Sequence, residues 1–150
     1  MASRRRSRQF ALQALFEADL RDVSAATALN DLWSGLMDDE GMSRPPESQE
    51  VEFAQRIVHG VEANRAAIDG LIEESSSNWR LGRMPLVDRN VLRMAAYELS
   101  QAVDIPVNVA INEAIELAKL FGTADSRAFV NGIVDRMARQ LGRLGSRDSR

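Results

Sequence analysis

The sequence predicts an all-α fold, and three observations support this prediction. Apolar residues recur at helical spacing along most of the chain, as Ala11, Leu12, Leu15 and Phe16 do near its start. No stretch of useful length alternates apolar and polar residues in the way that a half-buried strand does. The 150 residues are 45% apolar and 27% charged, a balance typical of a globular domain with a real hydrophobic core. We therefore expect a compact bundle of about seven helices joined by short loops.

Two helices are expected before the first long loop. The first spans the apolar residues of 10–20, whose stripe is wider than packing against a single core requires. This excess predicts that the helix also meets a second partner. The second helix spans 29–37, with Ser24 as its N-cap. One glycine and two prolines in 38–47 then predict a loop.

The third and fourth helices follow that loop. Ser48 is expected to cap the third helix, and the carboxylate of Glu50 in its first turn favours a helix start there. Gly60 and Asn64 predict a bend before the fourth helix begins.

Three more helices are expected in the second half of the chain. Apolar residues at helical spacing place them over 87–99, 109–118 and 129–141. Asp125 or Ser126 is expected to cap the last of them.

A polar run over 75–85, rich in serine and ending in proline, is the clearest boundary in the sequence. We expect a single helical domain over 1–141 with two subdomains, at about 1–78 and 79–141. The arginine-rich residues 142–150 are expected to form a mobile tail.

The net charge of −3 conceals a strong asymmetry. The first eight residues hold four arginines and no acid, whereas residues 9–135 hold 10 basic and 21 acidic side chains. The last fifteen residues again carry an excess of arginine. A polyanion should therefore be attracted to the ends of the chain and repelled by its body.

The residues that most enzymes and metal sites need are missing. The chain has no cysteine, its single histidine is His59, and it contains no HExxH, CxxC, GxGxxG or Walker-type motif. We expect no catalytic residues, no metal and no cofactor, and we expect a non-enzymatic protein of a reducing compartment, the cytoplasm. No apolar run approaches the roughly 20 residues of a membrane span, so no membrane association is expected.

The four N-terminal arginines are the best candidates for a binding function. Cations at a helix N-terminus oppose the helix dipole, so a bound polyanion explains them better than a solvated helix start does. A targeting peptide is the alternative interpretation, but Glu17, Asp19 and Asp22 follow at once within the same helical pattern. The candidate RNA-binding residues are Arg4, Arg5, Arg6 and Arg8.

Four stretches of the sequence resemble a known family in their order and spacing. The first, RRRSRQFALQALF, begins at Arg4. The other three are PLVDRNVLRMAAYEL from Pro85, DIPVNVAINEAIELAKLFG from Asp104 and SRAFVNGIVDR from Ser126. Together they are similar to the NusB family of bacterial transcription antitermination factors.

This resemblance implies a fold, a function and a set of partners. The fold is the all-α NusB fold of two helical subdomains. The function is binding of the single-stranded boxA element of nascent ribosomal RNA transcripts together with NusE, a ribosomal small-subunit protein. NusA, NusG and RNA polymerase complete the antitermination complex.

The resemblance also assigns roles to particular residues. Arg4, Arg5, Arg6 and Arg8 match the RNA-binding segment of the family. Phe16 and Leu20 match the surface that faces NusE, and Asp125 and Phe129 fall near the junction of the RNA and NusE surfaces. Core packing is an equal alternative for Phe129.

Two alternative functions stay open at this point. The wide apolar stripe of the first helix would also suit a homodimer that hides the arginine segment. The NusB fold also occurs in certain RNA cytosine methyltransferases, so an RNA-binding module that acts beside a separate catalytic chain is the other alternative.

Overall fold

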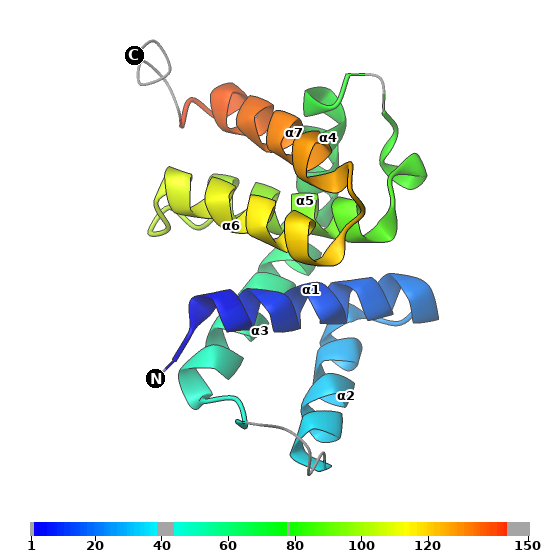
Figure 1. Ribbon diagram of the computed structural model, residues 1–150, viewed down its shortest axis with the longest axis vertical. Helices are drawn as coiled ribbons and strands as arrows, with labels where there is room; N and C mark the ends of the chain where they lie inside the picture. Colours follow the sequence, from blue (N-terminus) through cyan, green and yellow to red (C-terminus); the bar gives the residue numbers. More distant parts are fainter. Residues whose placement is uncertain (1, 39–43, 78, 144–150) are drawn as a thin grey trace. The chain divides into compact units, whose positions relative to one another are not determined.

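The computed structural model describes residues 2–38, 44–77 and 79–143, and over these residues the chain is all-α. The described residues form seven α-helices and one short 3-10 helix, whose arrangement is drawn in Figure 1. The helices are α1 (Arg4–Arg21), α2 (Ala25–Asp38), α3 (Ser48–Ala63), α4 (Arg65–Ser75), η1 (Leu81–Arg83), α5 (Leu86–Ser100), α6 (Val107–Phe121) and α7 (Ser126–Gln140). The predicted class and the expected number of helices are confirmed. None of these helices is long and apolar enough to cross a membrane.

The chain divides into two compact units, Met1–Ala63 and Asn64–Arg150. This division comes earlier than the boundary near residue 78 that the serine-rich run predicted. The reason is that the run folds against helices of the second unit. The Ser75 hydroxyl donates to Gln140 of α7 at 3.1 Å, and the Leu81 amide donates to the Glu73 carboxylate at 3.2 Å.

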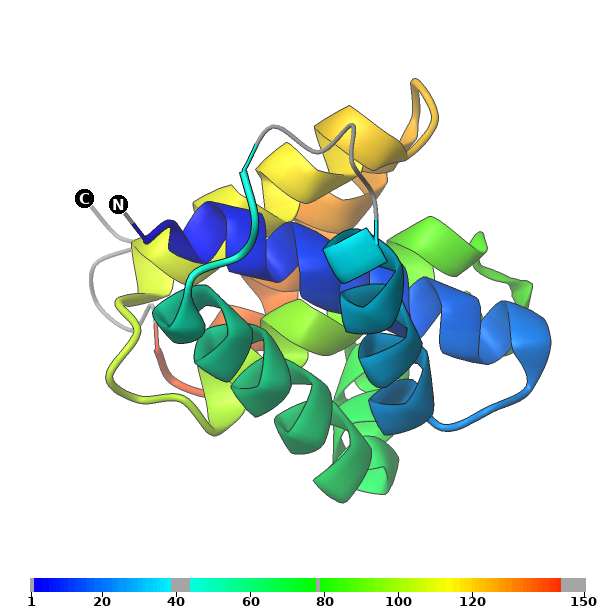
Figure 2. The same cartoon turned by 90° about the horizontal axis from the view of Figure 1, so that it is seen from below.

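In the first unit, α1 packs against both α2 and α3 (Figures 1 and 2). Buried apolar side chains come from all three helices, including Leu12 and Leu15 of α1, Leu29 of α2, and Ile57 of α3. Ser24 caps α2 as expected, because its hydroxyl accepts the Thr27 amide at 3.0 Å.

The start of α3 differs from the expectation. Ser48 is the first helical residue, and the preceding Glu47 occupies the cap position, since its carbonyl accepts the Val51 amide at 3.0 Å. The Glu50 carboxylate reaches back to the Glu47 amide at 3.0 Å. This is the acidic half of a capping box, so the first turn of α3 depends on Glu50 and not on Ser48.

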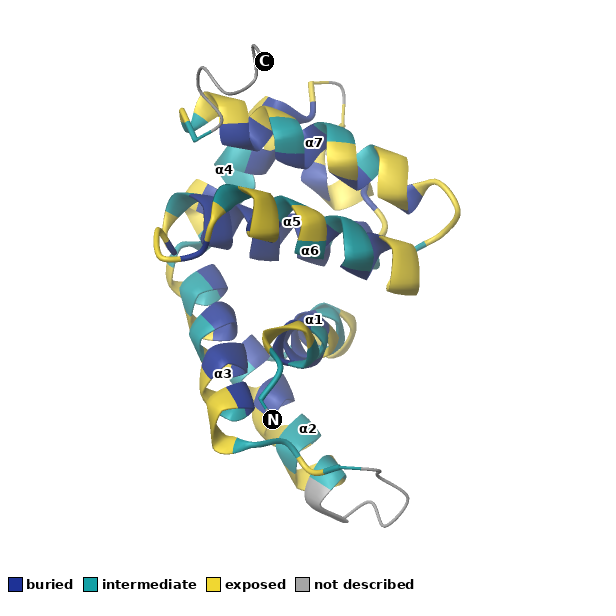
Figure 3. Cartoon of the chain, turned by 60° about the vertical axis from the view of Figure 1, so that its left-hand side comes forward, coloured by how far each residue is buried: buried dark blue, intermediate teal, exposed yellow. Residues whose placement is uncertain are grey.

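In the second unit, α5 packs against α4, α6 and α7 and is buried continuously over residues 90–99. Its polar side chains therefore need partners inside the protein. The Arg93 guanidinium pairs with the carboxylate of Asp69 on α4, with Nε at 2.9 Å from Oδ1. Arg93 also donates to Asn90 at 3.3 Å. Figure 3 shows α6 and α7 carrying exposed residues along their outer sides.

Asp125 occupies the N-cap position of α7, one of the two positions expected, because its carbonyl accepts the Phe129 amide at 3.1 Å, whereas Ser126 is the first helical residue. Asp125 stands at the cap position without a side-chain hydrogen bond, and the Ser126 hydroxyl is buried. That hydroxyl donates to Asp88 of α5 at 2.6 Å and accepts the Thr123 amide at 2.9 Å. It therefore ties the α6–α7 loop to α5 instead of capping the start of α7.

The expected mobile tail falls mostly outside the described residues, which end at Arg143. Arg143 itself is anchored, because its guanidinium donates to the carbonyl of Leu99 in the last turn of α5 and to that of Ile105 in the segment that follows.

The close packing between the end of α6 and the start of α7 leaves no room for a side chain at Gly122. A Cβ at this position would lie 2.7 Å from the Ala118 carbonyl oxygen and would collide with the Ser126 hydroxyl. Gly122→Ala should therefore lower the free energy of unfolding by about 1–3 kcal/mol in urea titrations. Gly70→Ala is the matched control, because a Cβ in the middle of α4 meets nothing within 4 Å. It should raise stability by about 0.5–1 kcal/mol. Equal stabilities for the two variants would contradict this packing.

Candidate nucleic-acid interface

The structure separates the four predicted arginines by the environment of each side chain. Arg4 and Arg5 are exposed at the start of α1, Arg6 is half-buried, and Arg8 is buried with 3% of its surface exposed. Ser3 sets the start of this helix, because its hydroxyl accepts the Arg6 amide at 3.1 Å. Four arginines that look equivalent in the sequence therefore differ in their exposure at the protein surface.

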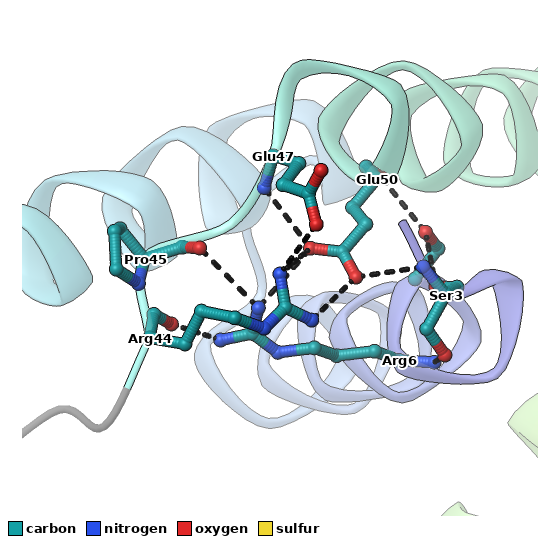
Figure 4. A network of polar contacts seen from close by, with 7 residues as sticks. Ser3, Arg6, Arg44, Pro45, Glu47 and Glu50 are labelled. Carbon is teal, nitrogen blue, oxygen red and sulfur yellow. Dashed lines mark hydrogen bonds and ion pairs between the residues drawn. The ribbon is translucent and has the colours of Figure 1, made fainter. Parts of the chain in front are cut away.

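Arg6 is held by the protein itself, in a network around the buried carboxylate of Glu50 (Figure 4). Its Nη1 lies 3.1 Å from Glu50 Oε1, and the Glu50 side chain has no exposed surface. The guanidinium of Arg6 also donates to the backbone carbonyls of Arg44 and Pro45. Arg6 therefore fixes the residues just before α3 onto the start of α1.

The carboxylate of Glu50 receives four further hydrogen bonds, and its backbone carbonyl receives one. Arg44 binds it with both terminal nitrogens, at 3.1 Å to Oε1 and 2.8 Å to Oε2. The amides of Ser3 and Glu47 donate to it at 2.9 and 3.0 Å. The Ser7 hydroxyl donates to the Glu50 backbone carbonyl at 3.0 Å. A buried carboxylate is stable only when it is paired and hydrogen-bonded, and Glu50 meets both conditions.

These contacts lower the pKa of Glu50 to about 2. The hydrogen bonds from Arg44 contribute most, and they outweigh the burial that acts in the opposite direction. The amides of Glu47 and Ser3 lower the pKa further. The same pairing raises the pKa of Arg44. Glu50 is therefore an anion at every physiological pH.

A second group of arginines surrounds the buried ring of Phe53 on α3. The guanidinium carbons of Arg4, Arg8 and Arg56 lie 4.3, 5.2 and 5.8 Å from the ring centroid. A guanidinium over an aromatic face is attracted by the ring's electrons, so Phe53 restrains side chains that would otherwise be mobile. An open cavity of about 460 Å³ lies at this place, lined by Ala2, Ser3, Arg4, Ser7, Gln49, Glu50, Glu52, Phe53 and Arg56.

The residues expected to face a protein partner lie in both units. On α1, Phe16 is half-buried, and Leu20 is 61% exposed. In the second unit, Asp125 is exposed and Phe129 is half-buried. The Phe129 ring packs edge-on against Trp79, at 5.4 Å between ring centroids, and Trp79 is 50% exposed. Phe129 therefore packs against another ring and also keeps accessible surface, so both core packing and partner binding remain open for it.

Glu50, Arg44 and Phe53 belong to the candidate site, and the sequence analysis does not identify them as site residues. Glu50 was assigned only a local role at the start of a helix. Its pairing with Arg6 joins residues 44 positions apart, so no local pattern could indicate it. The one available signal is a glutamate in the first turn after a loop, because such a side chain can reach back to the amide at the helix start.

Comparison with known proteins identifies the fold and the family. The model of the NusB family matches residues 5–139. The protein named transcription antitermination protein NusB from Geotalea uraniireducens (strain Rf4) is 48% identical over 94% of this chain and 97% of its own length. The protein of the same name from Myxococcus xanthus (strain DK1622) is also 48% identical, over 92% of this chain and 96% of its own length.

Solved structures agree with this result. T. maritima NusB superposes with a TM-score of 0.81 at 39% identity, covering 93% of this chain and 94% of that one. A structure described as antitermination factors NusB and NusE in complex with dsRNA superposes with a TM-score of 0.79 at 20% identity, over 91% of this chain and 96% of that one. At that identity the second match supports the fold alone.

The buried Glu50 predicts a specific pH dependence of stability. Its pKa is about 2 in the folded protein against an ordinary value of 4.5, so its stabilisation is complete above pH 4.5. That contribution is lost as the pH falls from about 4.5 to about 2. Glu50→Gln should lower the free energy of unfolding at pH 7 by about 1–3 kcal/mol. It should also flatten the decline of stability in that acid window, measured by urea unfolding at a series of pH values.

Glu52→Gln is the matched control, because Glu52 is an exposed glutamate on the same helix. It should leave the stability at pH 7 and the acid decline close to those of the unaltered protein. A Glu50→Gln protein with unchanged acid dependence would show that the network does not stabilise the fold.

Proposed function

The chain belongs to the NusB family of transcription antitermination factors, which are not enzymes, and from this premise we propose that it binds boxA RNA together with NusE. In this proposal the RNA is the single-stranded boxA element of nascent ribosomal RNA transcripts. NusE, NusA, NusG and RNA polymerase form the complex in which the protein acts. A structure with a similar fold is described as NusB and NusE in complex with dsRNA, and because this chain belongs to the same family we extend these classes of ligand and partner to it.

One observation carries the RNA-binding part of the proposal. Arg4 and Arg5 are exposed on the first turn of α1, and the Phe53 ring holds the Arg4 guanidinium at 4.3 Å. Arginine binds phosphate through a planar pair of N–H groups, so a guanidinium restrained in place loses less entropy on binding. Arg6 and Arg8 support the segment from within, since Arg6 pairs with Glu50 and Arg8 is buried beside Phe53.

The partner-binding part rests on the end of α1. Leu20 exposes 61% of its surface in the last turn, on the same helix as the RNA segment. A large exposed aliphatic side chain next to half-buried Phe16 suits a protein interface. Asp125 and Phe129 are the candidate contacts in the second unit. The homodimer is the competing use of this apolar surface.

Removing the two exposed arginines should weaken RNA binding in a salt-dependent way. For single-stranded RNA, log K falls by about 0.7 per unit of log salt for each phosphate neutralised. Arg4→Gln/Arg5→Gln should therefore flatten that slope by about 1.4 in fluorescence-anisotropy titrations with boxA RNA. Arg21→Gln is the matched control, because Arg21 pairs with Asp31 at 2.9 Å at the other end of α1. An unaltered slope in the double variant would remove Arg4 and Arg5 from the interface.

Leu20→Asp should weaken NusE binding by about tenfold or more, because a carboxylate would be desolvated in an apolar interface. The control is Val103→Asp, at a position that is 78% exposed in the second unit. Calorimetry with purified NusE measures both affinities. Equal affinities for the two variants would contradict the assignment of Leu20. Light scattering tests the alternative, since a homodimer that NusE fails to dissociate would contradict the proposed complex.

A further inference from the structure

The cavity beside Phe53 is lined by two helices, and each of them contributes an arginine. Arg4 comes from the start of α1, whereas Arg56 lies on the third turn of α3, outside the arginine-rich segment. Both guanidinium carbons lie within 5.8 Å of the same ring centroid. The two cations are therefore grouped at one place by a shared aromatic contact and not by their position in the sequence.

The charges around the cavity favour an anion more than a simple count of its charged lining residues suggests. Two carboxylates line it, Glu50 and Glu52. The charge of Glu50 is already balanced by Arg44 and Arg6, at 2.8 and 3.1 Å, and neither of these arginines lines the cavity. The other charged residues that line the cavity are the cations Arg4 and Arg56 and the anion Glu52, which together carry a net charge of +1.

The size and chemistry of the lining fit a nucleotide. The volume of about 460 Å³ lies within the range of roughly 300–1,000 Å³ that small-ligand pockets occupy. The arginines offer forked N–H donors for a phosphate. The exposed side chain of Gln49 offers an amide donor and an acceptor, which a nucleobase edge can use.

We propose that this cavity is a nucleotide subsite, in which Arg56 joins Arg4 on one phosphate of the bound RNA strand and Gln49 faces the adjoining base. The inference rests on the proposed RNA-binding function and extends that function from α1 to α3. Glu52 at the rim opposes the phosphate and weakens binding. RNA thus contacts a surface built from two helices, although only the arginines of α1 form a recognisable motif in the sequence.

The test compares single substitutions in the full chain, by fluorescence anisotropy with a labelled single-stranded boxA oligonucleotide at several salt concentrations. Arg56→Gln should weaken binding by about tenfold, as expected for loss of a charge-assisted contact, and should flatten the salt slope by about 0.7. Glu52→Gln should tighten binding several-fold, and because Glu52 is exposed this variant should fold normally. Arg21→Gln removes the same charge outside the cavity and should have little effect.

The outcomes separate this inference from the function on which it rests. If Arg4→Gln weakens binding but Arg56→Gln and Glu52→Gln leave affinity and salt slope unchanged, the subsite is overturned and the proposed function stands. Equal losses in Arg56→Gln and Arg21→Gln would mean that only long-range charge matters, which also overturns the subsite. If the unaltered protein binds no RNA even at low salt, both proposals fail. Should Arg56→Gln unfold, the response of Glu52→Gln decides.

Discussion

The buried carboxylate of Glu50 is the constraint on which the candidate interface depends. Its side chain has no exposed surface, and an anion removed from water needs cations and hydrogen-bond donors at close range. Those donors are the guanidiniums of Arg6 and Arg44 and the amides of Ser3 and Glu47. One charge therefore fixes the start of α1, the residues before α3 and the first turn of α3 in a single arrangement. The same contacts hold Arg6 against Glu50, whereas Arg4 and Arg5 are exposed at the start of α1.

Because of this arrangement, the four arginines of the N-terminal segment are not equivalent candidates for a phosphate contact. By charge alone, each of the four arginines is an equal candidate for a phosphate contact. In the folded chain, Arg6 neutralises an internal anion and Arg8 is buried beside Phe53. The first turn then presents Arg4 and Arg5, with Arg4 held over the Phe53 ring. Two of the cations therefore support the segment on which the other two are exposed, and in the proposed function this preorganisation would reduce the entropy lost on RNA binding.

The sequence predicted much of the fold and less of the site, for a physical reason. Helical periodicity is a local property, and it located the seven helices, the Ser24 cap and the break at Asn64 correctly. Side-chain partnership depends on which helices meet. Ser126 matched a capping pattern, yet its hydroxyl binds Asp88, 38 positions away. Arg6 matched the RNA-binding segment in the same way as Arg4. Its partner Glu50 lies 44 positions along the chain, so the local pattern could not separate the two arginines.

In the proposed function, Arg4 contacts RNA while Arg6 stays paired with Glu50. The most direct test is nitrogen-15 NMR of the arginine side chains during titration with boxA RNA, with each signal assigned by single substitution. The Nε signal of Arg4 should shift and saturate with added RNA, while that of Arg6 should keep its position. A large shift of the Arg6 signal with none at Arg4 would mean that RNA displaces Glu50 from its partner. That result would contradict the division of the arginines into a supporting pair and a binding pair.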